Sequence, residues 1–382
     1  MQLTKISYFL LVKIKKYFFL SKFFINFAHR NKKGHMDKYK SILNEHETEH
    51  AIKLIKDTFQ MHLANALCLK RVTAPLFVKS NLGLNDTLTG VEKPVSFVAT
   101  TIGQPCEIVH SLAKWKRMKL HDMHIEPGYG IYTDMNAIRA DEELDNIHSL
   151  YVDQWDWEKV ITEDSRRDVL YDSVKMIYNA LLHTEYAVYE HYPKLKPFLP
   201  KNFKWITSEE LLRLYPNLTP KERENEICKR YGAVFICGIG GKLSNGQPHG
   251  DRAPDYDDWS TTVCYAPQEI GAVIQNNGLN GDLLIWYEPL NQAIELSSMG
   301  VRVNAKALAT QLELSGKTEY AQYKYHKMVL NDELPQTIGG GIGQSRVCMV
   351  LLQKMHIGEV QSSIWSDEMI QECRENNINI LQ

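Results

Sequence analysis

A glycine run near the end of the chain could bind a phosphate. Residues 335–346 read Pro-Gln-Thr-Ile-Gly-Gly-Gly-Ile-Gly-Gln-Ser-Arg, so four glycines precede Arg346. Glycine permits positive φ values and a close approach of the backbone to a ligand. A helix that begins near Gln344 would direct free N–H groups at that ligand, and Arg346 could hold an anion with two hydrogen bonds. The stretch predicts a nucleotide phosphate site; a glycine turn that only packs a helix on a strand is the alternative.

Two common nucleotide-binding motifs do not fit this stretch. It lacks the Gly-Lys-Ser/Thr of a Walker phosphate loop, and Arg346 stands where the dinucleotide fingerprint has its third glycine. Other charged residues could complete a nucleotide site, namely Lys116 and Arg139 for anions and Asp282 and Glu295 for magnesium, which prefers oxygen ligands. Taken singly, each of these residues also fits a surface ion pair. Their positions beside glycine turns and at charged strand ends favour a shared site.

The elements that must position these residues read as a mixture of helices and strands. Residues 39–69 carry apolar side chains at three- and four-residue spacing, which predicts a helix. Further helices are expected at 111–119, 168–192, 205–215 and 220–230. Strands are expected at 72–78 with Pro75 at an edge or interface, and at 95–98, 107–110, 129–138, 148–158, 232–237, 283–286 and 293–296. Without a steady βαβ alternation, this order favours an α+β domain whose antiparallel sheet is flanked by helices.

The predicted strand at 148–158 has an unusual polar face. Its alternation places His148, Leu150, Val152, Gln154 and Asp156 on one side. Polar residues between tryptophans on a strand predict a surface that faces a ligand.

Composition limits the classes of partner. Seven scattered cysteines without a Cys-x-x-Cys pair argue against a zinc knuckle or a disulfide scaffold, and predict reduced thiols in the cytoplasm. Residues 1–35 contain eight Lys and Arg and no acid, which leaves 36 basic against 46 acidic residues, a net charge of −10, in 36–382. An acidic body is a poor partner for a polyanion, so no nucleic-acid partner is expected.

The basic, aromatic segment 1–35 has three open interpretations. Its apolar stretches are too short and too often interrupted by lysine to span a bilayer, so no stable membrane association is expected. It fits an organelle transit peptide, a helix that lies on a membrane surface, or sequence upstream of a true start at Met36. Residues 36–382 are expected to form a single catalytic domain.

Five long motifs carry a family resemblance that extends over about 36–365. They begin at His110 (His-Ser-Leu-Ala-Lys-Trp-Lys-Arg), Tyr151 (Tyr-Val-Asp-Gln-Trp-Asp-Trp-Glu), Arg252 (Arg-Ala-Pro-Asp-Tyr-Asp-Asp-Trp-Ser), Glu295 (Glu-Leu-Ser-Ser-Met-Gly-Val-Arg) and Pro335. In these motifs and their order the chain resembles the ammonia-dependent asparagine synthetases, or aspartate–ammonia ligases. That family is similar in fold to the catalytic domain of class II aminoacyl-tRNA synthetases.

The resemblance implies an enzyme that uses ATP and Mg²⁺ to form β-aspartyl-adenylate, which ammonia then converts to asparagine and AMP. It implies the catalytic residues Lys116, Arg139, Asp86 and Gln154. For substrate it implies Asp86, Lys116, Gln154, Asp156, Asp257 and Arg302. For the nucleotide it implies His110, Ser111, Arg139, Glu295, Gly341, Gly343 and Arg346, and for the metal Asp282, Glu295 and Ser298. A homodimer with Pro75 near its interface is also implied.

Three other functions compete with this interpretation. Glutamine-dependent asparagine synthetases need an N-terminal cysteine nucleophile, which neither Met1-Gln2 nor Met36-Asp37 supplies, so ammonia is the expected nitrogen donor. A tRNA ligase paralogue that activates an amino acid for another acceptor would need an anticodon-binding segment, and none is evident. A sensor that binds aspartate or adenylate without turnover is disfavoured because Lys116, Arg139 and Arg346 are all present.

Overall fold

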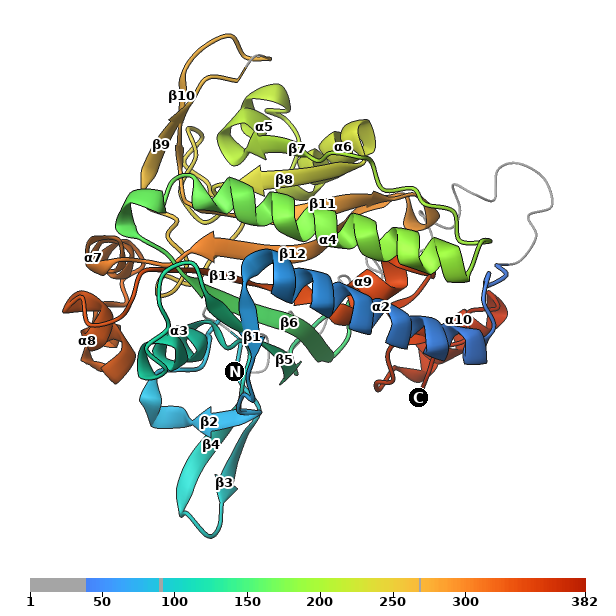
Figure 1. The fold of residues 1–382 in the computed structure, drawn as a ribbon, viewed down its shortest axis with the longest axis horizontal. Helices are drawn as coiled ribbons and strands as arrows, with labels where there is room; N and C mark the ends of the chain where they lie inside the picture. Colours follow the sequence, from blue (N-terminus) through green and yellow to red (C-terminus); the bar gives the residue numbers. More distant parts are fainter. Residues whose placement is uncertain (1–38, 89–91, 268) are drawn as a thin grey trace, which may run out of the picture.

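A computed structural model describes residues 39–88, 92–267 and 269–382 (Figure 1). The basic segment 1–35 and Met36 lie outside these residues, so their interpretation stays as predicted. Within the described part of the chain, no helix combines the length and the apolar character needed to cross a membrane.

An eight-stranded sheet forms the centre of the fold, in the order β1-β5-β6-β13-β12-β11-β8-β7. Its pairs are antiparallel except for β1 with β5 and β7 with β8, at the two edges. The strands span Leu69–Arg71 (β1), Gly130–Ile138 (β5), Tyr151–Val160 (β6), Lys204–Thr207 (β7), Ala233–Cys237 (β8), Asn280–Tyr287 (β11), Gln292–Val301 (β12) and Thr337–Gly343 (β13). The predicted α+β class with an antiparallel sheet and flanking helices is confirmed.

Two long helices, α2 (Glu45–Leu67) and α4 (Val169–His191), lie side by side across one face of the sheet (Figure 1). The predicted spacing on α2 is the reason: Ile55, Phe59 and Leu63 recur on one side and are fully buried. The Phe59 ring lies 4.5 Å from the Trp155 ring of β6. Each such side chain stabilises the fold by about 1.5–3 kcal/mol through burial. Asn44 begins α2 with a reciprocal capping box to Glu47.

Shorter elements surround this core. The remaining helices are α3 (Ala113–Asp122), α5 (Ser208–Leu214), α6 (Pro220–Tyr231), α7 (Ala305–Leu314), α8 (Lys324–Leu330), α9 (Gln344–Leu351) and α10 (Asp367–Glu375). A three-stranded sheet projects from the body (Figure 1), built from β2 (Phe77–Lys79), β4 (Gln104–Ile108) and β3 (Ser96–Ala99). A two-stranded arm consists of β9 (Thr262–Tyr265) and β10 (Ile274–Asn277).

Two predicted elements differ from the structure. Most of the strand expected at 72–78 is instead a connection between β1 and β2, and only its last two residues belong to β2. Pro75, which has no N–H to donate, lies in that connection. The helix expected at 205–215 begins only at Ser208, where the Thr207 hydroxyl accepts the Glu210 N–H. Its first residues form β7, because they pair with β8 in parallel. A strand of four residues is too short for the alternation of apolar and polar side chains to be recognised in the sequence.

The glycine run is also not the predicted turn. Gly339, Gly340, Gly341 and Gly343 belong to β13, between β6 and β12, and none has a positive φ. Their role is to leave space. A Cβ on Gly339 would lie 2.0 Å from Glu158 Oε2, and one on Gly341 would lie 2.2 Å from Gln154 Oε1. The bare strand therefore makes room for the side chains of β6.

We predict that Gly339→Ala destabilises the protein, because the added methyl would displace the buried Glu158 carboxylate. Overpacking of this kind costs about 1–3 kcal/mol. Gly343→Ala is the matched control on the same strand, because its nearest neighbours would lie at ordinary contact distances of 3.4–3.7 Å. Urea unfolding of both variants measures the difference. Equal midpoints would show that β13 does not need glycine for space.

Candidate active site

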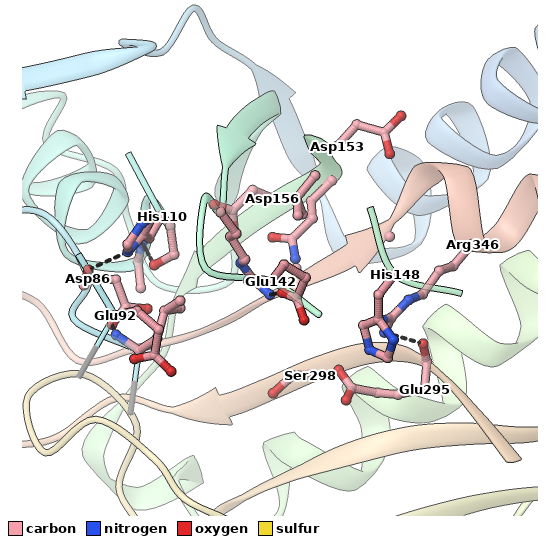
Figure 2. Close-up of a pocket in the computed structure, with 18 of the residues that line it drawn as sticks. Asp86, Glu92, His110, Glu142, His148, Asp153, Asp156, Glu295, Ser298 and Arg346 are labelled. Carbon is pink, nitrogen blue, oxygen red and sulfur yellow. Dashed lines mark hydrogen bonds and ion pairs between the residues drawn. The ribbon is translucent and has the colours of Figure 1, made fainter. Parts of the chain in front are cut away.

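A cavity of about 450 Å³ opens beside β5, β6, β12 and β13, and Figure 2 shows the residues that line it. Thirteen of the fifteen predicted site residues border this cavity, although they come from distant parts of the sequence. They are Asp86, His110, Ser111, Arg139, Gln154, Asp156, Asp257, Glu295, Ser298, Arg302, Gly341, Gly343 and Arg346. Lys116 and Asp282 do not line the cavity; each lies behind a residue that does.

The alternation of β6 places residues that line the cavity and residues of the core on opposite faces. Gln154 and Asp156 line the cavity, whereas Trp155 and Trp157 point to the opposite face and are fully buried. The strand begins at Tyr151, so His148 belongs to the loop before it. His148 still borders the cavity, and its Nδ1 lies 2.8 Å from Asp145 Oδ1.

Two cations and three carboxylates form a buried network under the cavity. Arg302 donates to Glu158 with Nε to Oε1 at 2.9 Å and Nη2 to Oε2 at 2.7 Å, and it also pairs with Asp257. Lys116 pairs with Asp156, donates to the Trp157 carbonyl oxygen at 2.8 Å, and lies 3.6 Å from Glu158. All five residues are buried. With every group ionised, the network carries one negative charge in excess.

The pKa directions of the three carboxylates follow from burial and from how closely each one contacts a cation. Burial raises the pKa of Asp156 above its usual value although Lys116 opposes the shift, and burial likewise raises the pKa of Asp257 against Arg302. Burial acts on Glu158 in the same direction, but the forked contact with Arg302 outweighs it and leaves the pKa of Glu158 lowered. Glu158 is thus the carboxylate held ionised, and the other two favour an additional positive charge nearby.

Two arginines, Arg139 and Arg346, border the cavity. Arg139 follows β5, lies 3.8 Å from Glu142, and has a buried Nε–H without a hydrogen-bond partner among the described residues. Arg346 lies in the first turn of α9, which begins at Gln344 as predicted. Its Nε donates to the Ile147 carbonyl oxygen at 3.3 Å, and its Nη1 donates to the Glu295 carbonyl oxygen at 3.1 Å (Figure 2).

The predicted metal ligands gather around an arginine that sequence reasoning missed. Arg252 donates to Asp282 and, at 3.2 Å, to Ser298 Oγ. Asp282 is opposite Ser298 in the pairing of β11 with β12. Burial raises the pKa of Asp282 to about 6 against the effect of Arg252, and Glu295 adds to the rise. Two carboxylates and a hydroxyl are hard oxygen donors, so they fit magnesium chemistry. The Arg252 guanidinium contacts Asp282 and Ser298, and it partly neutralises the charge of Asp282.

Asp86 and His110 lie together at the other side of the cavity from Arg346, with Asp156 between (Figure 2). His110 Nδ1 is 3.2 Å from the Asp86 carbonyl oxygen, and the His110 N–H donates to Asn85. Burial lowers the pKa of His110, which favours the neutral ring at pH 7.

Several further residues at or behind the cavity were not predicted. Besides Arg252 they include Asp153, Glu158, Tyr256 and Asp255, the last of which accepts from Lys114 at 2.8 Å and lies 2.9 Å from His326. All five lie in the motifs that begin at Tyr151 and Arg252, and Glu158 ends the first of them. The high density of charged residues in those motifs was the sequence signal that could have identified them.

The fold is that of the class II aminoacyl-tRNA synthetases. Asparaginyl-tRNA synthetase from Pyrococcus horikoshii, complexed with asparaginyl-adenylate, aligns with a TM-score of 0.60 at 12% identity over 82% of this chain and 68% of that one. The Entamoeba histolytica asparaginyl-tRNA synthetase in complex with asparaginyl-adenylate gives 0.60 at 13% identity, over 83% and 66%. These likenesses establish the architecture.

Sequence comparison gives the family. The family profile described as Aspartate-ammonia ligase matches residues 46–377. Aspartate–ammonia ligase of Bacteroides fragilis is 55% identical over 345 residues, which cover 90% of this chain and 97% of that protein. The Parabacteroides distasonis protein of the same name is 57% identical over 338 residues, 88% and 95%. The chain belongs to the aspartate–ammonia ligase family, and the resemblance carried by the five motifs is confirmed.

We predict that Arg302→Met destabilises the fold by about 3–5 kcal/mol, because it leaves Glu158 and Asp257 buried without their partner. Arg71→Met is the control, since Arg71 pairs with Asp134 at the surface and such pairs contribute about 0–1 kcal/mol. Chemical unfolding at pH 7 compares the two. A similar small loss in both would contradict the buried network.

Proposed function

We propose that the cavity catalyses the ATP-dependent ligation of ammonia to aspartate. One observation carries this assignment: the cavity joins a buried, negatively charged network to two arginines. Aspartate and ATP together require both kinds of site, one for an ammonium group and one for phosphates. In the proposed reaction the β-carboxylate of aspartate attacks the α-phosphorus of ATP and pyrophosphate leaves. Ammonia then attacks the acyl carbon, and AMP leaves as asparagine forms.

The aspartate end would be built on the buried network. The excess negative charge shared by Asp156 and Asp257 would be neutralised by the α-ammonium of aspartate, which restores the charge balance of a dry site. Arg302 borders the cavity and could extend its charge to a substrate carboxylate. Lys116 pairs with Asp156 behind the cavity wall, so we propose that it acts on the substrate mainly through that carboxylate.

The nucleotide end would depend on Arg139 and Arg346. Two anionic substrates repel each other, and fixed cations offset that repulsion. The guanidinium of Arg139, which borders the cavity, could donate to the α-phosphate, where negative charge develops in the transition state. The glycines at 339–343 pair in the sheet on both sides, so their contribution is space for the nucleotide and the β6 side chains. His110 and Ser111 remain candidates for the nucleotide.

Asp282 and Glu295, with Ser298, would hold magnesium. The ion would supply positive charge to the phosphates of ATP. Arg252 lies among the same oxygens and would keep Asp282 oriented.

The second step needs a proton acceptor, because ammonia is mostly ammonium at neutral pH. A carboxylate beside the acyl carbon could attract ammonium and accept its proton. Asp86, Asp156 and Asp257 all border the cavity. The raised pKa of Asp156 and of Asp257 brings each closer to the pH at which such transfer is efficient.

We also propose a homodimer of single catalytic domains, 36–382, in the cytoplasm and without a nucleic-acid partner. All seven cysteines are free, which suits a reducing compartment. The projecting sheet β2-β4-β3, next to Pro75, exposes apolar side chains that a second copy would cover. They are Leu76, Phe77, Phe97, Val98 and Ile102.

The full-length protein, given ATP, magnesium, aspartate and ammonium, should produce AMP and asparagine in equal amounts. Chromatography of both products over time measures this. Arg139→Ala should lower kcat by about 10²–10³ because one fixed donor to the developing charge is lost; the exposed Arg230→Ala is the control. Equal turnover with glutamine at low ammonia would contradict the proposed nitrogen donor. AMP formation without asparagine would mean another acceptor, and tRNA aminoacylation is then the competing function.

Sedimentation velocity should show a dimer at micromolar protein. Val98→Asp, on β3, should shift the protein toward monomer because a charge would be buried in the proposed interface. Val273→Asp is the matched control, since Val273 is a similarly exposed valine beside β10, on the two-stranded arm. A monomeric wild type, or loss of the dimer in both variants, would reject this interface.

A further inference from the structure

Asp153 borders the cavity at its edge, but its carboxylate is not directed at Asp156 or the other predicted aspartate-binding residues. It lies between Val152 and Gln154, so the alternation of the strand turns its side chain to the face that carries Trp155 and Trp157. Figure 2 shows its carboxylate directed away from Asp156 and Glu295, toward neighbouring helices. The side chain is buried. A buried carboxylate needs partners, and those partners indicate what it does.

Helix α2, helix α9 and the segment that contains Gln361 supply the partners of Asp153. Lys56 of α2 places Nζ 3.2 Å from Oδ2. The Ser345 N–H of α9 donates to Oδ1 at 3.0 Å, and Gln361 Nε2 lies 3.4 Å from the same oxygen. Gln361 also donates to Ser345 Oγ at 2.9 Å. The carboxylate therefore connects α2 and β6 to the first turn of α9.

The contact with Ser345 fixes the start of the helix that carries Arg346. The first N–H groups of a helix lack partners within the helix, and a negative charge at that end is favourable. No side chain of the N-cap residue Gly343 can serve, because glycine has none. Asp153 supplies the acceptor from a neighbouring strand. Gln344 is held in turn by Asp134, at 3.0 Å.

Arg346 depends on this anchoring. Its own hydrogen bonds go to two main-chain carbonyl oxygens, those of Ile147 and Glu295. Neutral acceptors of this kind hold a guanidinium less strongly than a carboxylate does. The direction of the side chain therefore follows the backbone position of residues 344–346.

We propose that Asp153 is a positioning residue for Arg346: it anchors the first turn of α9, and Lys56 of α2 keeps its carboxylate in place. The proposal rests on the proposed function in one respect, that Arg346 meets the nucleotide. Asp153 borders the cavity, but its carboxylate is occupied by Lys56 and Ser345, so in this proposal it acts through Ser345 and not by contact with a substrate. The expected consequence is a selective loss of ATP affinity. Aspartate binding, which is proposed to use Asp156 and Asp257, is expected to be retained.

The test measures the Kd of ATP by calorimetry, and KM for ATP and for aspartate in turnover, for the full-length protein. Asp153→Ala should weaken ATP binding about tenfold, as loss of a helix cap of ~1.4 kcal/mol would. Its KM for aspartate should stay within about twofold. Asp153→Asn should weaken ATP binding less, because its amide oxygen can still accept the Ser345 N–H. Lys56→Met should fall between wild type and Asp153→Ala.

Lys53→Met is the matched control: Lys53 lies on the same helix, α2, and pairs with Asp57 at the surface, so ATP affinity should not change. Arg346→Ala should lose ATP affinity, and adding Asp153→Ala to it should cost little more. The proposal would be overturned by additive losses of ATP affinity in the double variant. It would also be overturned if Asp153→Ala weakened ATP and aspartate equally, or lowered thermal stability alone. Because the Kd of ATP is measured without turnover, a protein that binds ATP but makes no asparagine would reject the proposed function and still test Asp153.

Discussion

The site depends on one buried interaction, the fork between Arg302 and Glu158. Removing these charges from water is costly, and only full hydrogen bonding offsets that cost. The structure provides it: Thr337 donates to Glu158 at 2.7 Å, and the Arg302 N–H donates to the Thr337 carbonyl oxygen at 2.8 Å. Arg166 in turn donates to the Arg302 carbonyl oxygen and to Asp258. The strands β6 and β13, the end of β12 and the acidic loop after Arg252 are thereby held in one arrangement.

The two faces of β6 explain how a polar site coexists with an apolar core. The period of two puts Gln154, Asp156 and Glu158 on the side of α3 and the cavity, and the tryptophans under α2 and α4. The same helix layer that buries Trp155 also brings Lys56 to Asp153. Packing and positioning of the site are thus carried by the same elements, so the site needs no separate scaffold.

Sequence patterns predicted the elements with a clear period and the residue types of the site. Helix α2 and strand β6 follow from spacing alone, and the motif residues converge on one cavity. The side-chain pairings of the site could not be predicted, because they join residues that are distant in the sequence. Nothing local states that Lys116 turns to Asp156, or that Arg252 meets Asp282. The glycine run was misread as a turn because glycine fits two needs that look alike in sequence, a positive φ and an absent side chain. The structure shows the second.

The place of β13 in the sheet has a consequence for how the chain reaches this fold. Among the described strands β13 comes last in sequence, yet it pairs with both β6 and β12 in the middle of the sheet. During synthesis the strands made earlier can form two part-sheets, and β6 in one and β12 in the other then present an edge that only β13 will pair. A glycine-rich segment has little strand preference of its own, so it depends on both edges for its conformation. Asp156 and Glu295 lie on opposite sides of it. The cavity, which residues of β6, β12 and β13 border together, is therefore complete only when the last strand joins the two halves.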